Sequence, residues 1–475
     1  MRSSAWTAAA LCWLSAGRVL CDEVDAQSHS GLVGVDASDP QYLVYEVHDV
    51  EVVLAENESL SKRLDTKRHL EEKEKLLKRL SKSHGTWNEH HARHRLLEAL
   101  RGFSAYADTQ QAELTRLKGL YSHVPKKQKS LLERTVKYSQ KFNDVSELLK
   151  KNQQLCDDIV RNAMEFYGVS QQELDKHVKA MKKVSRPAER VSVSQALKHF
   201  VRDWAASGAH ERDAAFPCIL QALKDQFPDA GEKEVKILLP GAGLGRLGHE
   251  VAQLPGFQVT NNEWSAYQNI AYRFLTQPTS QSQPHRPNTT TLHPFIDSWS
   301  HHRSTASMLR SIPIPDIPIH PTDVLLVEGD FTTAFPASDH HTSGGYDALT
   351  THFFIDTARN LAAYLETIAR LVRPGGVWVN FGPLLYGSAP FVQLALDEVV
   401  ALAEAVGFEF LEVPVSVGGG EGGEGDGGAG WGKCKAEEGV VPGKRVYGVE
   451  AVYGFDERAL TRNAYEAVFW VARKL

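Results

Sequence analysis

A short glycine-rich loop between a predicted strand and a predicted helix constrains the fold of this chain more than any other feature. The apolar stretch 234–239 is followed by Pro240 and then by Gly241, Gly243 and Gly245, and a helical pattern begins directly afterwards. Glycine lets the backbone turn tightly and approach a ligand without a Cβ in the way. The N-terminus of the following helix presents free N–H groups to oxygen atoms of that ligand. The motif therefore predicts a ligand site at the end of the first strand of an α/β sheet.

The strands expected after this loop define the fold class. Apolar strand candidates alternate with helical patterns, at 234–239, 257–260, 324–327, 347–351, 377–380 and 408–413. Such alternation implies a mostly parallel sheet with helices on both faces. We therefore predict a Rossmann-like α/β domain over residues 187–475. Two irregular insertions should interrupt it, the Pro- and Ser-rich stretch 277–321 and the glycine-rich stretch 418–430.

The sequence before this domain is charged and helical in pattern. Leucines recur at helical spacing over 90–186, which predicts an α-helical region that packs on the α/β domain. Residues 22–89 are predicted to be disordered, apart from a charged, exposed helix over 56–83. Residues 1–21 have a basic start and a short apolar run, which predicts a secretory signal peptide or a disordered extension. We expect no stable membrane insertion, because no stretch approaches transmembrane length.

Composition excludes several other classes of protein. The net charge of −6 gives no indication of nucleic-acid binding, which usually needs a basic face. The five cysteines include no C-x-x-C pair, so neither a zinc ribbon nor a redox motif is predicted, and we expect free thiols. We also expect no metal, because no His, Asp or Glu cluster shows the spacing of metal ligands.

The spacing of the glycines and the acids that follow them indicate which ligand the loop binds. The loop reads G-x-G-x-G rather than the dinucleotide fingerprint G-x-G-x-x-G, and it matches the cofactor loop of S-adenosylmethionine enzymes better. Glu263 ends the next strand, where a carboxylate accepts both ribose hydroxyls, although acids at strand ends also occur on bare surfaces. Asp330 closes a later strand and could bond the adenine amino group while Phe331 covers the ring. The alternative for Asp330 is a helix N-cap.

A further strand end brings polar groups next to an apolar run. The predicted strand 347–351 ends at the carboxyl edge of the sheet, where open α/β folds bind their ligands. His352 and Asp356 follow it directly. Asp356 could instead cap the helix predicted over 357–371, and both roles could hold together. Downstream, the turn Pro374-Gly375-Gly376 supports the fold without naming a substrate.

Together these motifs carry a family resemblance. From Val193 to Leu475 the chain resembles the carnosine N-methyltransferase family, eukaryotic enzymes that methylate the histidine imidazole of carnosine and related dipeptides. The helical stretch 90–158 is similar to the N-terminal region of that family, more loosely. The segments that carry the match are 200–204, 211–213, 240–248, 262–265, 329–331, 353–358, 374–376, 382–386, 465–466 and 473–474.

The resemblance implies a cofactor, a substrate and the residues that hold them. S-adenosyl-L-methionine would be contacted by His199, Arg202, Gly241, Gly243, Gly245, Glu263, Asp330, Phe331 and His352. Asp356 and Tyr465 would bind the substrate and act in catalysis. Because Leu239 stands where many such enzymes carry an acid, the methionine end of the cofactor should rely on Arg202.

Two departures from the family pattern leave the substrate open. The family has a histidine at Gly387 and a second tyrosine at Asn463. Either the substrate differs or another residue takes over, and the loop 339–341 offers two histidines that are solvated in the simpler interpretation. Three functions therefore stay open: a carnosine-type histidine N-methyltransferase, a methyltransferase of the same fold that acts on another small molecule or on peptide or protein histidine, and a non-catalytic cofactor-binding relative. A nicotinamide oxidoreductase is disfavoured by the glycine spacing.

The compartment and the assembly are predicted less directly. The resemblance implies a location in the cytosol or nucleus, whereas a signal peptide over 1–21 would imply the secretory pathway. We expect a dipeptide or other small molecule as the partner, no nucleic acid, and a helical N-terminal region that allows a homodimer.

Overall fold

The computed structural model describes residues 9–15, 18–22, 44–46, 67–276, 290–336, 344–387, 389–413, 434 and 436–475. Two compact units divide the chain, residues 1–67 and 68–475. In the first unit, strands β1 (Ala9–Ser15), β2 (Arg18–Asp22) and β3 (Val44–Glu46) form an antiparallel sheet in the order β2-β1-β3. The rest of the predicted signal peptide or extension lies outside the described residues, as does the glycine-rich insertion 418–430.

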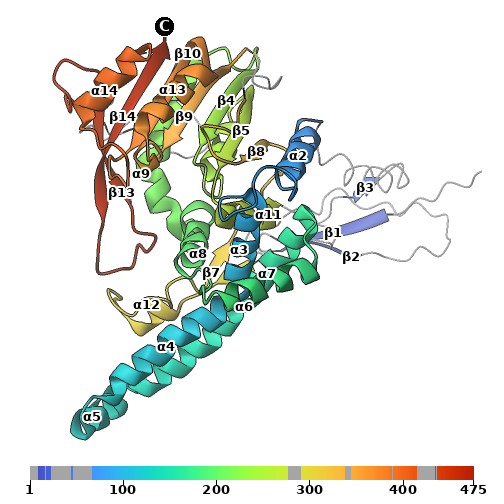
Figure 1. The fold of residues 1–475 in the computed structure, drawn as a ribbon, viewed down its shortest axis with the longest axis vertical. Helices are drawn as coiled ribbons and strands as arrows, with labels where there is room; N and C mark the ends of the chain where they lie inside the picture. The colour runs from blue at the N-terminus through green and yellow to red at the C-terminus, as the bar shows by residue number, and fades with distance from the viewer. Residues whose placement is uncertain are drawn as a thin grey trace, which may run out of the picture. The chain divides into compact units, whose positions relative to one another are not determined.

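A parallel sheet forms the centre of the second unit (Figure 1). Its strands are β4 (Val235–Pro240), β5 (Phe257–Glu263), β8 (Val324–Glu328), β9 (Tyr346–His352) and β10 (Val372–Gly382). They pair in the order β10-β9-β4-β5-β8, which confirms the predicted Rossmann-like fold. The chain order reverses between β4 and β9, and ligands of open α/β sheets bind at such a switch point.

Antiparallel strands extend the sheet beyond β10. The long strand β14 (Ala464–Lys474) pairs antiparallel with β10 on one side. On its other side it pairs with β13 (Tyr447–Val452) and with β11 (Phe408–Phe410). The two-residue strand β12 (Glu437–Glu438) pairs with β13 at the edge. The sheet is therefore mixed, with an antiparallel strand beside the last parallel one.

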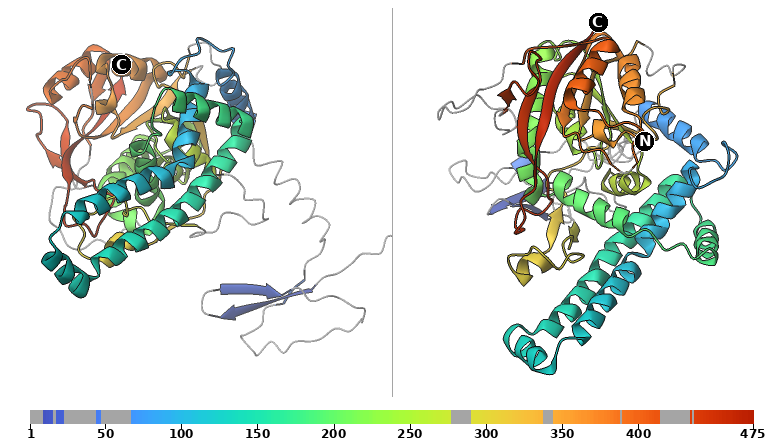
Figure 2. Two further views of the ribbon diagram at one scale, coloured as in Figure 1. Left: turned by 60° about the horizontal axis from the view of Figure 1, so that its bottom comes forward. Right: turned by 60° about the vertical axis from the view of Figure 1, so that its left-hand side comes forward.

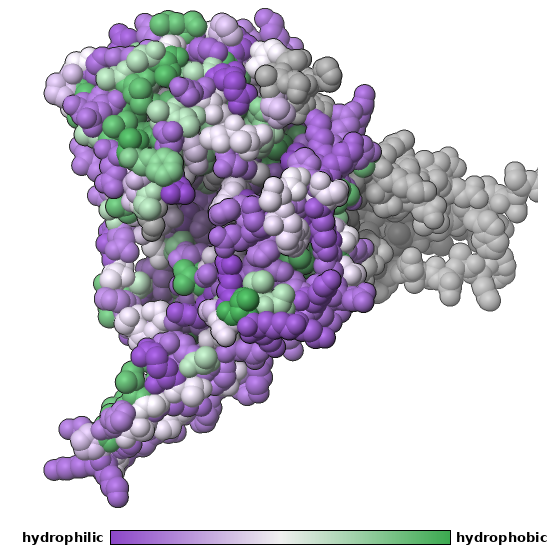
Figure 3. Space-filling model, viewed as in Figure 1, coloured by the Kyte–Doolittle hydropathy of each residue, from purple (hydrophilic) through white to green (hydrophobic). Residues whose placement is uncertain are grey.

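Helices cover both faces of this sheet because strand side chains alternate between the faces. Leu238 of β4 lies in one apolar cluster, with residues of α13 (Leu361–Leu371) and α14 (Leu396–Ala405). Its neighbours Ile237 and Leu239 lie in the other, with residues of α9 (Ala209–Gln226) and α10 (Arg246–Ala252). Apolar residues on consecutive positions of β4 thus bury both faces of the strand. Figure 3 shows hydrophobic residues gathered over α14 on the visible face.

The predicted helical region forms five helices, some of which project as an arm. They are α3 (Ala92–Ser104), α4 (Tyr106–Ser122), α5 (Lys126–Val136), α6 (Tyr138–Tyr167) and α7 (Gln171–Lys183). The break before α5 falls at Pro125, because proline cannot continue the preceding helix. Helices α4, α5 and α6 extend away from the sheet in every view (Figure 1 and Figure 2). At its base, the long helix α6 packs against α3 and against α11 (Ala266–Thr276) in one apolar core that also includes α8 (Val191–Trp204).

Helix α2 (Lys67–Arg79) lies within the charged helix predicted over 56–83, but it is not exposed as predicted. Its residues Glu72 and Leu76 are buried. Arg68 donates to the carbonyl of Val259 at 3.1 Å, and Arg79 to that of Glu328 at 3.2 Å. The charged helix is therefore held against β5 and β8. Long arginine side chains can do this because the stem covers apolar surface while the head reaches backbone oxygens.

The insertion 277–321 is more ordered than its composition predicts. Residues 277–289 lie outside the described part of the chain. The remainder contains β6 (Thr290–Leu292), the short helix α12 (Thr305–Leu309) and β7 (Ile312–Ile314), with β6 and β7 paired antiparallel. Apolar side chains of all three are buried in the core shared with α6 and α8. The expectation of an irregular excursion is wrong there, because burial of apolar residues outweighs the turn-forming composition.

Two further observations concern the whole chain. Cys218 and Cys434 form a disulfide, so the expectation of free thiols is wrong for this pair, while Cys156 is a buried free cysteine. Sequence patterns do not reveal this pairing, because the two cysteines are 216 residues apart. Among the described residues, no helix is long and apolar enough to cross a membrane.

Candidate cofactor and substrate site

The glycine loop between β4 and α10 has the backbone that the sequence predicts. Gly241, Gly243 and Gly245 have φ angles of 67°, 58° and 81°, all in the left-handed region that disfavours other residues. A Cβ on Gly241 would collide with the ring of Phe354, and one on Gly245 would lie 2.8 Å from Tyr272. Gly243 differs, because its Cβ position faces His199 at 3.4 Å. A side chain at Gly241 or Gly245 would thus collide with a packed ring. At Gly243 the missing side chain instead leaves room beside His199.

A cavity of about 240 Å³ lies beside this loop at the switch point between β4 and β9. Six of the nine predicted cofactor residues line it, namely His199, Arg202, Gly241, Gly243, Glu263 and His352. They come from α8, from the loop after β4, and from the ends of β5 and β9. The carboxyl ends of neighbouring parallel strands meet at one edge, which is why residues distant in sequence converge here.

The lining of this cavity includes polar atoms that no described residue satisfies. Nδ1 of His199, Nη2 of Arg202 and Nε2 of His352 are buried without a hydrogen-bond partner among the described residues. Nε of Arg202 lies 3.2 Å from Oε2 of Glu211, and the guanidinium carbon lies 4.2 Å from the ring centre of Tyr453. Buried polar groups without partners are costly, so donors gathered around a cavity fit a polar ligand such as a carboxylate.

Burial keeps the two imidazoles of this cavity neutral. Burial, with a smaller contribution from the positive charge of Arg202, lowers the pKa of His352 to about 3. The same two causes lower the pKa of His199 well below its usual value. Both rings are therefore uncharged at neutral pH and can each donate or accept a hydrogen bond without adding charge.

Glu263 joins the glycine loop to the end of β5. Its Oε2 accepts from the backbone N–H of Gly243 at 2.9 Å, and its Oε1 accepts from that of Ser265 at 2.7 Å. Burial raises the pKa of Glu263, and these backbone hydrogen bonds oppose the rise. Each oxygen keeps a second lone pair, so the carboxylate can still accept the two hydroxyls of a ribose.

A second cavity of about 570 Å³ lies beyond Glu263 and contains Asp330. Asp330 is exposed, and its Oδ1 accepts from the backbone N–H of Thr332 at 2.8 Å. Sequence patterns gave no sign of two further lining residues from distant segments, Arg95 of α3 and Leu76 of α2. The guanidinium carbon of Arg95 lies 4.0 Å from the ring centre of Trp264, which also lines this cavity.

Two predicted cofactor residues do not line either cavity. Phe331 is buried against Phe354 and Tyr364, so it packs in the core rather than on open space. Gly245 begins α10 and contacts Tyr272 instead. Both support the loops that do line the cavities.

Asp356 does not line the smaller cavity and does not cap a helix. It belongs to the 3₁₀ turn Ile355–Thr357, and α13 begins later, at Leu361. Its Oδ2 accepts from the backbone N–H of Leu385 at 3.0 Å. Burial raises the pKa of Asp356 to about 6. The carboxyl group is thus held next to the loop that contains Gly387, while the neighbouring Thr357 lines the cavity.

The aromatic rings of Phe353 and Tyr453 lie between Tyr465 and the smaller cavity. The ring centre of Tyr465 is 6.0 Å from that of Phe353 and 5.6 Å from that of Tyr453, and both of these line the smaller cavity. Phe353 has a φ of 50°, a strained value for a bulky residue. Tyr465 itself lines an open cavity of about 980 Å³ along β13 and β14, so the rings of Phe353 and Tyr453 separate two spaces.

The two positions that depart from the family pattern, Gly387 and Asn463, are both exposed. A tyrosine, the residue type that the family has at Asn463, lies next to Asn463. Gly387 has no atom within 4 Å of its Cβ position. Asn463 accepts at its carbonyl from the backbone N–H of Tyr453 at 3.0 Å, across the hairpin. A tyrosine therefore stands directly opposite Asn463. The histidines of loop 339–341 lie outside the described residues.

One cluster contradicts the expectation that no residues show metal-ligand geometry. Among the described residues, His94, Glu98 and His177 each offer a ligand atom, all within 4.8 Å of one another. His177 lies far along the sequence from the other two, and for that reason sequence spacing did not reveal the group.

Comparison with known proteins identifies the family of this chain. The family model of carnosine N-methyltransferase matches residues 179–421, more than half of the 475 residues. Carnosine N-methyltransferase of Mus musculus is 29% identical, over 66% of this chain and 78% of its own length. That of Schizosaccharomyces pombe is 31% identical, over 46% of this chain and 62% of its own. A solved TehB-like SAM-dependent methyltransferase from Corynebacterium glutamicum is 14% identical with a TM-score of 0.26, covering 53% of this chain and 86% of its own. This chain is a methyltransferase enzyme and belongs to the carnosine N-methyltransferase family.

Proposed function

We propose that this chain is an S-adenosylmethionine-dependent N-methyltransferase that methylates the histidine imidazole of carnosine or a related histidine-containing dipeptide. With carnosine the product would be anserine. The observation that carries the proposal is the convergence of six predicted cofactor residues on one cavity at the sheet's switch point. This is where a ligand of an open α/β sheet binds.

The residues present fit the proposed cofactor. Arg202 would take the carboxylate of the methionine end, because its Nη2 is buried without a partner among the described residues. Glu263 would accept the ribose hydroxyls, and Asp330, on the adjoining cavity, the adenine amino group. When bound, the cofactor supplies an electrophilic methyl group on a sulfonium. The neutral rings of His199 and His352 add no positive charge that would repel that sulfonium.

On the substrate side, the chain needs to orient an imidazole rather than to activate it strongly. A neutral imidazole is already a fair nucleophile near pH 7. Asp356 would accept a hydrogen bond from the ring N–H that does not attack, which fixes the tautomer and stabilises the growing positive charge. Tyr465 would hold the ring or the dipeptide backbone. Tyr453, opposite Asn463, is the residue that we propose takes the place of the family's second tyrosine.

The test is a direct assay of transfer with a panel of acceptors. Purified chain is incubated with isotopically labelled S-adenosylmethionine and carnosine, homologous dipeptides, free histidine or histidine-containing peptides. Mass spectrometry then locates the label. We expect label on an imidazole nitrogen of carnosine or a related dipeptide. Label on no dipeptide, with cofactor binding intact, would contradict the substrate assignment.

A second candidate is a methyltransferase of the same fold that acts on peptide or protein histidine. It is favoured by the absence of a histidine at Gly387 and by the open cavity of about 980 Å³ at Tyr465, which is at the upper end of the range for small-molecule sites. In the same assay this candidate predicts label on peptides and not on carnosine.

A further inference from the structure

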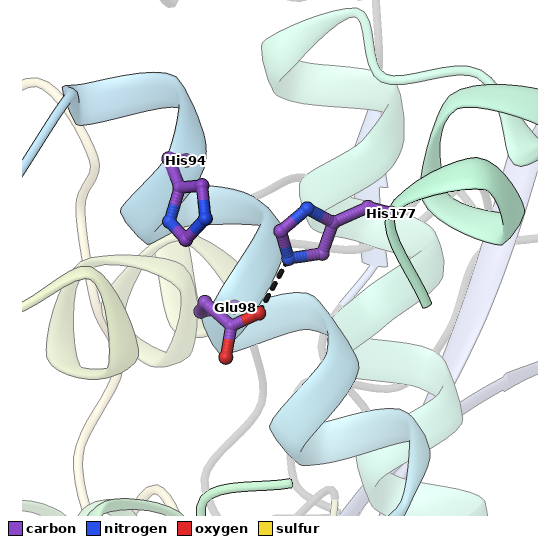
Figure 4. A group of neighbouring side chains, drawn as sticks. All are labelled: His94, Glu98 and His177. Atoms are coloured by element: carbon purple, nitrogen blue, oxygen red, sulfur yellow. Dashed lines mark hydrogen bonds and ion pairs between the residues drawn. The ribbon is translucent and has the colours of Figure 1, made fainter. Parts of the chain in front are cut away.

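A buried group of two histidines and one glutamate joins two helices of the N-terminal region. His94 and Glu98 are one helical turn apart on α3, and His177 faces them from α7 (Figure 4). One ligand atom of each residue lies within 4.8 Å of the other two. His94 is 8% exposed and His177 7% exposed. The group therefore has the side chains and the spacing of a three-ligand metal site, away from bulk solvent.

One of the two histidines, His94, has a buried ring nitrogen, Nδ1, that forms no hydrogen bond among the described residues. The ring instead lies edge-on to His177, with centres 4.9 Å apart, and near the ring of Trp87 at 5.9 Å. A buried polar atom without a partner costs free energy, so such an atom in a native protein calls for a ligand or another explanation.

The other two residues are held in place by neighbours. Nε2 of His177 lies 2.5 Å from Oε1 of Glu98, as the dashed line in Figure 4 marks. Oε2 of Glu98 accepts from Nη2 of Arg101 at 2.7 Å, and Arg101 also donates to the carbonyl of Pro187. Nε of Arg101 also donates to Oε1 at 3.2 Å, so Arg101 orients the carboxylate as an outer-shell partner of a metal ligand would. A metal ion would take the place of the proton between Nε2 of His177 and Oε1 of Glu98.

We propose that His94, Glu98 and His177 bind a divalent transition-metal ion, Zn²⁺ in the first instance. Imidazole nitrogen and carboxylate oxygen are zinc ligands, and three of them leave a fourth tetrahedral position for water. The magnesium and calcium ions prefer sites made entirely of oxygen, which the two imidazoles disfavour. The i, i+4 pair on α3 supplies two ligands from one helix face, and α7 supplies the third.

The ion would cross-link α7 to α3, next to the cofactor cavities. Arg93 of α3 already pairs with Glu173 of α7 at 2.6 Å. Arg95, also on α3, stacks on Trp264 in the cavity that contains Asp330. None of the three ligands lines that cavity or the smaller one, so the role is structural and does not depend on methyl transfer.

The proposal is tested by metal binding to the full chain. Protein stripped with a chelator and dialysed is titrated with ZnCl₂ in a calorimeter, and its metal content is measured after dialysis. We expect one zinc ion per chain. His94→Ala and His177→Ala should each weaken binding by at least the roughly 100-fold that losing an outer-shell partner can cost. The control His90→Ala, at a histidine whose side chain is 85% exposed, should bind like the wild type.

A second measurement covers the case in which the alanine variants do not fold. The wild-type melting temperature should rise with ZnCl₂ concentration, since a ligand of the native state stabilises it by mass action. Glu98→Gln keeps the shape of the side chain and should lose that rise. Co²⁺ should give the visible bands of a tetrahedral site in the wild type. Sub-stoichiometric zinc with no thermal shift in the wild type would overturn the proposal, whatever the result of the methyl-transfer assay.

Discussion

Arg202 shows most clearly how single residues build this site. It is part of α8, outside the sheet, yet it reaches the cavity beside the glycine loop. Its guanidinium lies between Glu211 and the rings of Tyr453 and Phe455, the latter at 4.6 Å. A planar guanidinium can stack on rings and bind a carboxylate at once, which a lysine cannot do.

Arg202→Lys should therefore weaken cofactor binding without unfolding the chain. A hydrogen bond to a charged group contributes about 1.5–3 kcal/mol, which corresponds to roughly a 10- to 100-fold rise in Kd. Calorimetric titration with S-adenosylhomocysteine measures this change. The matched control is Arg134→Lys, at an exposed arginine of α5, which should leave Kd unchanged. An unaltered Kd in Arg202→Lys would remove Arg202 from the cofactor site.

Asp356 should add a second ionisation to the acidic side of the pH profile of kcat/KM. Its pKa of about 6 means that the carboxylate is lost as pH falls through 6, and with it the acceptor for the imidazole N–H. The substrate imidazole, with a pKa of about 6.5, is protonated over the same range. Below both values, log kcat/KM for the wild type should fall with a slope of two.

In Asp356→Asn the residual kcat/KM should fall with a slope of one, because only the substrate still titrates. We expect its rate at neutral pH to be lower by about 10²- to 10³-fold, the effect of losing one group that stabilises charge in the transition state. S-adenosylhomocysteine binding should not change. Asp225→Asn, at an exposed aspartate of α9, controls for the substitution itself. A slope of two in Asp356→Asn would show that another group titrates.

At the scale of elements, α2 brings a charged helix against the cofactor region. Its Leu76 is 3% exposed and lines the cavity that contains Asp330, whereas Leu70 on the same helix is 47% exposed. The helix thus has one face on the sheet and one in solvent. Its contacts to β5 and β8 include polar ones from Arg68, His69 and Arg79, and Leu76 is its one buried apolar residue. With so little apolar burial it should detach locally before the sheet unfolds.

Leu76→Ala should loosen α2 and weaken S-adenosylhomocysteine binding severalfold. Removing a buried leucine side chain costs about 2–5 kcal/mol, and here the loss falls first on the local opening of the helix. Hydrogen exchange over residues 67–80 should accelerate while exchange in β4 stays slow. Leu70→Ala should change stability by no more than about 0.5 kcal/mol. Equal exchange rates in the two variants would mean that the buried face contributes nothing.

At the scale of the whole molecule, the Cys218–Cys434 disulfide connects α9 to the chain just before the edge strand β12, across 216 residues. A cross-link over a long loop restricts the unfolded chain, so its reduction should lower the free energy of unfolding by about 2–4 kcal/mol. Calorimetry with and without a thiol reductant measures the shift in melting temperature. Cys434→Ala should lose the response to reductant, and Cys156→Ala should keep it. A reductant effect that survives in Cys434→Ala would contradict the pairing.

The sequence by itself determined what neighbouring residues decide among themselves. The strand, glycine loop and helix at 234–247, the acid at Glu263 and the six predicted strands all follow from local spacing, because backbone conformation and side-chain alternation are set within a few residues. Because both residues follow predicted strands, these patterns also predicted that His352 and Glu263 lie at the carboxyl edge of the sheet, as the loop does. Arg202 and His199 were reached by resemblance and not by pattern.

Only the tertiary structure decided what depends on segments far apart in the chain. It placed Tyr453 opposite Asn463, Arg95 against Trp264, α2 on the sheet edge, His177 beside Glu98, and Cys218 beside Cys434. It also buried Phe331 in the core, away from both cavities. No local pattern encodes such contacts, because each partner alone reads as an ordinary surface or core residue. Their pairing is fixed by how the apolar faces of whole helices and strands bury one another.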